Sequence, residues 1–346
     1  MLSDLKKIIY APNIHNGGGE VLLLPLLQAL ESSEEILYVL DTRLKTEGWN
    51  PKGTVIKVKS SFFSRIYMEL FLFKIIKPCQ QLLCMGNFPP IFARTRNLTV
   101  FVQNCFLVNQ EVLNDFSFFI RCRIKIGRWL LKFLTPKVSR FIVQTKTMAF
   151  QLKRTLKRES YIFPFCELTF DLIKKEAENS QKKHYDFVYV ASGEPHKNHK
   201  KLLLAWIKLA QLNYIPSLCI ILSKNRYPRL YEWIDSIVKK NCLNIEIRSE
   251  LSRQQIADIY RKSKALIYPS KHESFGLPLI EAVSIGLPVL ASDLSYVYDV
   301  IKPSMVFNPN SSDSIAFSVI NFTYKPASFK CKINNTVNFL NQVFKD

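Results

Sequence analysis

Two glutamates flank a Gly-Leu-Pro sequence in the segment 268–291. Glu273 and Glu281 have seven residues between them, which read SFGLPLI. Carboxylates accept hydrogen bonds from hydroxyl groups, and backbone N–H groups at the start of a helix bind anions such as phosphate. A single loop and helix of this kind can therefore bind a molecule that carries both phosphates and sugar hydroxyls.

Proline and glycine predict where the helix in this segment begins and ends. Pro278 suits the first turn of a helix and Gly286 suits its exit, which predicts a helix over 277–285. The first glutamate then lies on the loop before the helix, and the second lies on its body. The backbone N–H groups of Phe275, Gly276 and Leu277 would stand at the helix N-terminus, where such groups have no partner within the helix.

The elements that must position this segment follow from a regular alternation along the chain. Short apolar runs alternate with helical patterns, which is typical of parallel βαβ units. We predict an α/β fold with two Rossmann-like domains, whose parallel sheets face a central cleft at the carboxyl ends of their strands. The predicted strands are 6–11, 35–40, 54–59, 81–84, 98–103 and 140–144 in the first half, and 186–190, 218–222, 244–247, 265–268, 289–291 and 305–307 in the second.

The length of 346 residues also favours two domains, because a single core seldom grows this large. A charged stretch over 153–183, broken by Pro164, marks the boundary. We predict a first domain over 1–170, a second over 171–330 and a terminal helix over 331–346.

More of the segment around the two glutamates matches a known pattern. The residues in register are Tyr268-Pro269-Ser270, Glu273, Phe275-Gly276, Pro278, Glu281-Ala282, Gly286 and Pro288-Val289. This block resembles the donor-binding motif of the retaining glycosyltransferases of family 4, of the kind that builds bacterial cell-surface polysaccharide and O-antigen. Such enzymes have the two-domain GT-B fold.

The resemblance implies an activity and a division of labour between the domains. A hexose or deoxyhexose, such as mannose, rhamnose or glucose, would pass from a nucleoside-diphosphate sugar to a lipid-linked saccharide, with retention at the anomeric carbon. The first domain would bind the acceptor and the second the nucleotide sugar, while the terminal helix crosses back to the first domain. The product would be a surface polysaccharide or lipopolysaccharide.

The same resemblance implies roles for individual residues. Glu281 would bind the donor ribose and Glu273 the donor sugar. Lys197, together with the N–H groups of Phe275, Gly276 and Leu277, would stabilise the departing diphosphate, so Glu273 and Lys197 are the predicted catalytic residues. The family needs no metal or cofactor besides the nucleotide sugar.

Two further loops match the family in part. Gly17-Gly18-Gly19 follows the first strand and resembles the loop that meets the donor diphosphate, which would involve Gly18 and Gly19. After the strand 186–190, Lys197 occupies the expected lysine position, but Ser192 stands where relatives have arginine.

Several polar residues are predicted contacts of lower specificity. Ser249 and Leu251 lie where relatives touch the nucleotide base. Gln103 and Asn104 end a predicted strand, and with His15 they are candidates for contact with the sugar or the acceptor. A structural turn explains the two amides equally well.

The charge is strongly basic, with a formal net charge of +20. Residues 1–165 carry 24 Lys and Arg against 11 Asp and Glu, which points to a polyanionic partner. Basic residues recur at helical spacing in 116–134, and aromatic residues line the helical patterns at 116–134 and 61–77. Arg121, Lys125, Arg128 and Lys132 would dock the protein on an anionic membrane, unless both helices simply pack on the core.

These features predict a cytoplasmic protein that is peripheral to the inner face of the cell membrane. We expect no secretory signal and no spanning helix, and we expect the eight cysteines to be reduced. Four other functions remain open: a soluble glycosyltransferase that acts on sugars or glucans, a GT-B sugar-nucleotide epimerase, a non-catalytic scaffold, and a nucleic-acid-binding protein. The last is suggested by charge alone, because no nucleic-acid recognition motif is present.

Overall fold

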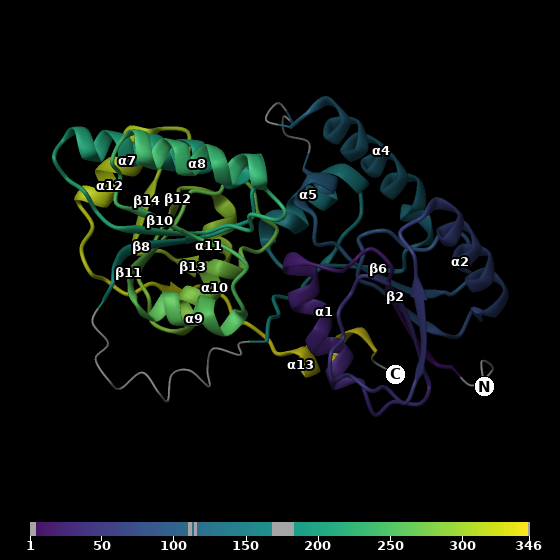
Figure 1. The fold of residues 1–346 in the computed structure, drawn as a ribbon. Coiled ribbons are helices and arrows are strands. Elements are labelled where there is room, and N and C mark those ends of the chain that lie inside the picture. Colours follow the sequence, from purple (N-terminus) through teal and green to yellow (C-terminus); the bar gives the residue numbers. More distant parts are fainter. Residues whose placement is uncertain (1–4, 110–112, 114–115, 168–182, 345–346) are drawn as a thin grey trace. The chain divides into compact units, whose positions relative to one another are not determined.

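The computed structural model describes residues 5–109, 113, 116–167 and 183–344. The chain divides into two compact units, of which unit 1 consists of residues 1–167 and 333–346, and unit 2 of residues 168–332. Each unit is a Rossmann-like α/β domain built on a parallel sheet (Figure 1). The predicted fold class is therefore confirmed.

Unit 1 contains a seven-stranded sheet in the order β3-β2-β1-β4-β5-β6-β7, in which all neighbouring strands are parallel. The six strands predicted for the first half are present, each within two residues of the expected bounds. The seventh strand, β7, is short and was not predicted. The strands are β1 (Lys7–Ala11), β2 (Ile36–Asp41), β3 (Thr54–Val58), β4 (Gln81–Cys84), β5 (Asn97–Phe101), β6 (Arg140–Val143) and β7 (Tyr161–Ile162).

The helices of unit 1 are α1 (Gly17–Ala29), α2 (Phe62–Ile75), α3 (Cys105–Val108), α4 (Phe118–Leu134), α5 (Lys146–Leu156) and α13 (Thr336–Val343), with a 3-10 turn, η1 (Thr135–Lys137), after α4. One hydrophobic core joins alternate residues of the central strands to the inner residues of α2, α4 and α5, such as Leu72, Leu131 and Leu152. Helices α2 and α4 therefore cover the same face of this sheet.

The C-terminal helix α13 packs within unit 1. The ring of Phe339 stacks on that of Phe165, with centroids 3.9 Å apart, and also contacts the ring of Phe101. The guanidinium of Arg140 donates to the carbonyl oxygens of Gln342 (2.9 Å) and Val343 (2.6 Å). The end of the chain thus belongs to the core of the first unit.

Unit 2 contains a six-stranded parallel sheet in the order β10-β9-β8-β11-β12-β14. Helices α7, α8 and α12 lie on one side of it, and α9 and α10 on the other (Figure 1). All six strands predicted for this half are present. The strands are β8 (Tyr185–Val190), β9 (Leu218–Ile221), β10 (Ile245–Arg248), β11 (Ser263–Tyr268), β12 (Val289–Ser292) and β14 (Met305–Phe307), and β13 (Ile301–Lys302) pairs with β15 (Ser328–Phe329).

The helices of unit 2 connect these strands in the manner of βαβ units. They are α7 (His199–Gln211), α8 (Pro228–Lys240), α9 (Arg253–Arg261), α10 (Leu277–Ser284), α11 (Ser295–Val300) and α12 (Ser312–Ile320), and a 3-10 turn, η2 (Pro195–Lys197), precedes α7. Helix α10 ends one residue before the predicted position, and Gly286 follows it with a φ of 74°. A left-handed φ of this kind favours glycine, so the exit predicted from the sequence is confirmed.

Candidate functional site

The order of strands in unit 2 reverses between β8 and β11, which lie side by side at the centre of the sheet. Helices that leave these two strands cover opposite faces of the sheet, so the loops at their carboxyl ends diverge and leave room for a ligand. The two loops are 191–198, after β8, and 269–276, after β11. Lys197 lies on the first loop and Glu273 on the second.

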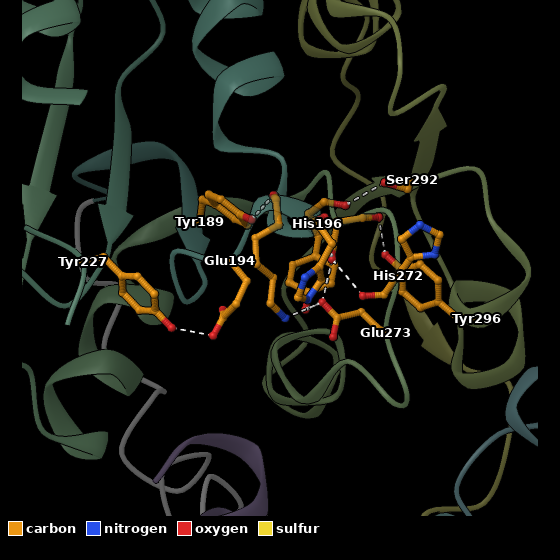
Figure 2. A network of polar contacts seen from close by, with 11 residues as sticks. Tyr189, Glu194, His196, Tyr227, His272, Glu273, Ser292 and Tyr296 are labelled. Carbon is orange, nitrogen blue, oxygen red and sulfur yellow. Dashed lines mark hydrogen bonds and ion pairs between the residues drawn. The ribbon is translucent and has the colours of Figure 1, made fainter. Parts of the chain in front are cut away.

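The carboxylate of Glu273 is the centre of a network of polar contacts (Figure 2). Its Oε1 atom receives three donors: the ammonium of Lys197 at 2.6 Å, the phenol hydroxyl of Tyr268 at 2.7 Å and the hydroxyl of Ser270 at 2.7 Å. The side chains of Glu273 and Lys197 are 10% and 14% exposed. Within the described part of the chain, no donor contacts the other oxygen, Oε2, which leaves it available to accept from a ligand hydroxyl.

The backbone around these side chains is fixed by a second set of contacts. Tyr189 donates its hydroxyl to the carbonyl of Lys197, and Tyr296 donates to the carbonyl of Ser270 at 2.8 Å. The N–H group of Lys271 donates to the carbonyl of His196 at 2.8 Å, which joins the two loops directly. In the view of Figure 2, Tyr189 and Tyr296 lie on opposite sides of Glu273. The site is preorganised because its supporting groups are buried and paired.

Charge in this site is shaped by burial and by pairing. Burial alone would raise the pKa of Glu273. This pKa is nevertheless held below its ordinary value, by the Lys197 ammonium, by the nearby His196 and by the hydrogen bonds that Glu273 accepts. Burial lowers the pKa of His196 to about 4 and that of His199 to about 3, so both imidazoles are neutral at pH 7. The histidines therefore add no positive charge at pH 7, and the central ion pair is that of Glu273 and Lys197.

The N-terminus of α10 follows this loop directly. Gly276 is the residue before the helix and has a φ of 79°, where a side chain would be strained and would meet Leu279 at 3.1 Å. Pro278 occupies the first turn, as its fixed φ allows. The N–H groups of Phe275, Gly276 and Leu277 thus lie at the positive end of the helix dipole, which favours an anion.

Glu281 lies one turn further along α10. Tyr260, from α9, donates its hydroxyl to Oε2 of Glu281 at 3.1 Å. Burial raises the pKa of this carboxyl, although Arg253 and the hydrogen bond from Tyr260 oppose the shift. Glu281 is therefore a half-buried acceptor on the helix whose N-terminus is the proposed phosphate site.

The start of the loop after β8 differs in charge from the family pattern, as the sequence indicated. Ser192 precedes Gly193 and Glu194, and Oε1 of Glu194 accepts a hydrogen bond of 2.5 Å from Tyr227. The ring of Tyr227 covers Gly193 so closely that a Cβ atom there would lie 2.4 Å from it. No cation replaces the expected arginine among these residues, and a carboxylate stands in its neighbourhood instead.

Ser249 and Leu251 lie on the loop after β10. The hydroxyl of Ser249 accepts from the N–H group of Lys224 at 2.7 Å, and Glu250 accepts from Ser223 at 2.7 Å. These contacts join the loops that follow β9 and β10. The side chain of Ser249 therefore has a structural role, and contact of this loop with a base stays a prediction.

Comparison with known proteins identifies the region that contains this site. Residues 171–335 match the family model described as "Glycosyl transferases group 1". These residues are similar to that family, and we refer to them below as the group 1 domain. The match confirms the family resemblance for the segment that holds both glutamates and Lys197.

Curated relatives of the chain are named as mannosyltransferases. The chain is similar to the O-antigen chain mannosyltransferase RfbU of Salmonella typhimurium, with 26% identity over 61% of this chain and 58% of that protein. It is also similar to the O-antigen chain mannosyltransferase B of Escherichia coli, with 27% identity over 38% of this chain and 35% of that protein. The aligned region thus spans little more than half of the first relative and about a third of the second.

A solved structure extends the likeness beyond the group 1 domain. Alr3699/HepE of Anabaena, in complex with UDP and glucose, superposes with a TM-score of 0.66 at 12% identity, covering 91% of this chain and 89% of that one. An identity this low supports the fold alone. The two-domain GT-B architecture predicted for the whole chain is in agreement with it.

Outside the group 1 domain, the glycines after β1 are placed differently from the prediction. They form the first turn of α1 and not a free loop before it, and Gly17 has a φ of 66°. A Cβ atom at Gly19 would lie 3.3 Å from Ile14 and 3.4 Å from Gln103, so this position is closely packed. The N–H groups of Gly18 and Gly19 are then first-turn amides of a helix, which have no partner within it.

The remaining polar residues predicted in unit 1 have structural contacts. Gln103 donates its side-chain amide to the carbonyl of Met85 at 2.9 Å, and Asn104 caps α3 by accepting from Phe106 at 3.0 Å. His15 is partly exposed, with its Nδ1 atom 3.8 Å from the carboxylate of Asp41. Contact of these three residues with a sugar or acceptor stays a prediction.

Sequence reasoning missed the buried carboxylate of Asp41, which lies at the carboxyl end of β2. It is fully buried and receives Nε of Arg43 at 2.9 Å and a terminal guanidinium nitrogen at 2.7 Å. An aspartate directly after the apolar run ILYVL was the available signal. Tyr189 and Tyr296 were missed as well, because each holds the site through a backbone carbonyl, of Lys197 and of Ser270 respectively, and such contacts leave no sequence motif.

The basic residues of α4 differ in their exposure to solvent. Lys125 and Lys132 are exposed and Arg121 is partly exposed. Arg128 is directed inward, because its Nε donates to the carbonyl of Phe106 at 2.8 Å. Burial lowers the pKa of this guanidinium, so Arg128 is the member of the predicted stripe that does not fit a docking role.

Proposed function

We propose that this protein transfers a hexose or deoxyhexose from a nucleoside-diphosphate sugar to a hydroxyl group of a growing glycan, with retention at the anomeric carbon. The observation that carries the proposal is the placement of the Lys197–Glu273 pair beside the N-terminus of α10, at the switch point of a group 1 domain. An ammonium, a free carboxylate oxygen and helix amides are the groups that a sugar diphosphate requires.

Each part of the donor has a proposed partner in unit 2. The diphosphate binds the N–H groups of Phe275, Gly276 and Leu277 and the ammonium of Lys197. The sugar hydroxyls bind the free oxygen of Glu273, and the ribose hydroxyls bind Glu281. The helix N–H groups and the Lys197 ammonium act where negative charge grows on the departing phosphate. Such electrostatic stabilisation is usually the largest contribution to the rate of these transfers.

The transfer itself needs no covalent partner from this site. The bond between the anomeric carbon and the phosphate oxygen breaks, and the diphosphate leaves with the electron pair. The bond between that carbon and the acceptor oxygen forms, and the proton of the acceptor hydroxyl passes to an oxygen of the leaving diphosphate. No group of three or more His, Cys, Asp or Glu suited to a metal ion occurs in the described residues, and we propose that the reaction proceeds without a metal.

The curated relatives support a mannose-like donor sugar. Two of them are named O-antigen chain mannosyltransferases. By analogy, the acceptor is a lipid-linked saccharide in the synthesis of a surface polysaccharide or lipopolysaccharide. The analogy is limited to the aligned region of those relatives.

A lipid-linked acceptor requires access to a membrane, and two helices of unit 1 are suited to it. Large apolar side chains stand exposed on the outer faces of both α2 and α4, where a core-packed helix would show polar residues. Phe63 is 82% exposed, Phe119 83% and Trp129 65%. We define the outer apolar surface by Phe63, Ile66, Tyr67, Leu70, Phe118, Phe119, Ile126, Trp129 and Phe133.

Charge around the outer apolar surface favours an anionic membrane. Helix α4 carries five basic residues and no acidic one, and its Lys125 and Lys132 are exposed. Aromatic side chains prefer the headgroup region of a bilayer, and each basic residue near an anionic surface adds about 1 kcal/mol. No helix in the described ranges is long and apolar enough to span a bilayer. Peripheral docking at the inner face of the membrane is therefore part of the proposal.

The proposed function is tested by assay of the purified protein with a panel of nucleotide sugars, including UDP-glucose, GDP-mannose and dTDP-rhamnose. Binding of one donor raises the melting temperature, because the ligand binds the native state only. Addition of lipid-linked saccharide must then release nucleoside diphosphate and form an α-linked product from an α-linked donor. Conversion of the donor without an acceptor would indicate an epimerase, and binding to no donor would contradict the proposal.

A further inference from the structure

The ammonium of Lys197 forms an ion pair with a neighbouring carboxylate, which competes with any phosphate for it. Its Nζ atom lies 2.6 Å from Oε1 of Glu273, and both side chains are largely buried. Under the proposed function, the same ammonium binds the donor diphosphate. Glu273 and the diphosphate are therefore alternative partners for one cation.

We propose that Glu273 competes with the product nucleoside diphosphate for Lys197, and that the return of the lysine to Glu273 promotes product release. The inference rests on the proposed function, and it adds a step after the transfer. Glu273 thus has two roles, one toward the donor sugar and one toward the diphosphate that remains when the sugar has gone.

The local structure allows the lysine to exchange partners without any change of the backbone. The turn η2 that carries Lys197 is fixed, because Tyr189 donates to the carbonyl of Lys197 and Asn198 donates its side-chain amide to two carbonyls, Pro269 at 3.1 Å and Pro309 at 2.7 Å. Glu273 is fixed by Tyr268 and Ser270. The movable part is the flexible four-carbon chain of the lysine.

The charges of donor and product explain why such a competitor is useful. The transfer breaks the bond to the sugar, and the phosphate oxygen that leaves gains a negative charge. The product is thus held more strongly than the donor by the helix amides and by Lys197. At the same time Glu273 loses the sugar hydroxyls from its free oxygen. Its buried negative charge then repels the product and attracts the ammonium.

The central experiment compares nucleoside diphosphate binding to the wild type and to Glu273→Gln. Glutamine keeps an oxygen for Tyr268 and Ser270 but carries no charge, so Lys197 becomes free for the phosphate. We expect UDP or GDP, tested separately by isothermal titration calorimetry, to bind on the order of tenfold more tightly to the variant. The product should also inhibit turnover at a lower concentration, while the corresponding nucleotide sugar should bind no more tightly.

Glu281→Gln is the matched control, because it removes a second, partly buried carboxylate from the same segment. In the free protein this carboxylate accepts from Tyr260 and has no ion pair with a lysine in the described residues. It should therefore give no gain in diphosphate affinity. The double variant Glu273→Gln/Lys197→Met should lose the gain, because the gain depends on the freed ammonium.

The outcomes separate this inference from the proposed function. Wild-type binding of UDP or GDP with equal or weaker binding by a folded Glu273→Gln would overturn the competition and leave the proposed function standing. A gain of the same size in Glu281→Gln would also overturn it, because the effect would then be general to loss of charge. Failure of the wild type to bind any nucleoside diphosphate or nucleotide sugar would overturn both. If the lysine variant does not fold, the comparison of the two glutamine variants still decides.

Discussion

Tyr260 donates its phenol hydroxyl to Oε2 of Glu281, across 3.1 Å between α9 and α10. The contact holds a half-buried carboxylate on the helix whose N-terminus is the proposed phosphate site. We expect Glu281→Ala to weaken binding of the nucleotide sugar by about tenfold or more, because one or two hydrogen bonds to ribose are lost. Tyr260→Phe should cost less, since the carboxylate remains. Equal calorimetric affinities for the wild type and Glu281→Ala would remove this residue from the site.

Lys197→Ala should reduce turnover more than affinity. The ammonium is needed most when charge grows on the departing diphosphate, so we expect kcat to fall about a hundredfold while KM changes little. The substitution also leaves the buried Glu273 carboxylate without its ion pair, which should lower the free energy of unfolding by about 3 kcal/mol. Steady-state kinetics and urea unfolding measure the two effects. Unchanged transfer kinetics would contradict the assignment.

Loss of the Tyr268 hydroxyl tests the preorganisation of Glu273. In Tyr268→Phe, Oε1 of Glu273 keeps Lys197 and Ser270 but loses one of three donors. We expect transition-state stabilisation, measured as kcat/KM, to fall by about 1–2 kcal/mol. The affinity for free nucleoside diphosphate should change little. Ser292→Ala, which removes a more distant contact to the carbonyl of Tyr268, is the control and should change neither value. A kcat/KM for Tyr268→Phe equal to that of the wild type would show that the third donor is dispensable.

The outer apolar surface should be required for binding to anionic vesicles. Replacing Phe119, Trp129 and Phe133 by serine should reduce cosedimentation with vesicles of phosphatidylglycerol and phosphatidylcholine. Replacing Arg121, Lys125 and Lys132 by glutamine should do so as well, most clearly at low salt. Arg128 is retained in both variants because it bonds to Phe106.

The control for the vesicle experiment lies in unit 2. Phe317 is 68% exposed on α12, outside the outer apolar surface, so Phe317→Ser should leave vesicle binding unchanged. Full retention on vesicles by both unit 1 variants would refute membrane docking by α2 and α4.

The two buried histidines should make the fold less stable as the pH falls below about 6.5. Burial lowers the pKa of His196 to about 4 and of His199 to about 3, so the unfolded chain takes up protons that the folded chain does not. Between pH 6.5 and 5, each should lower the free energy of unfolding by about 1.4 kcal/mol per pH unit. His199→Gln should remove one such contribution, as measured by urea unfolding at both pH values. An unchanged slope in this variant would contradict the burial of a neutral His199.

The sequence predicted the local structure of the site well, because that structure depends on residues that begin and end a helix. Pro278 and Gly286 placed α10 within one residue, and both glutamates lie where that helix required. Apolar runs of four to six residues predicted the central strands, since parallel strands covered on both faces are uniformly apolar. The weakest strand, β7, has two exposed residues and gave no such signal.

Contacts between residues that are far apart in the sequence could not be predicted in this way. Lys197 and Glu273 are 76 residues apart, and only the pairing of β8 with β11 brings them together. The faces of α4 were also assigned incompletely, because spacing predicts that two stripes exist but not which stripe faces the core. Arg128 and Trp129 are neighbours in the chain, yet one is directed toward α3 and the other is exposed.

The central claim is that a nucleotide sugar binds at the switch point of the group 1 domain. The most direct test is the electron density of crystals grown with the donor identified in the panel. We expect diphosphate oxygens within hydrogen-bonding distance of the N–H groups of Phe275, Gly276 and Leu277, with ribose hydroxyls at Glu281. A donor bound elsewhere on the chain, with these groups contacting only protein, would contradict it.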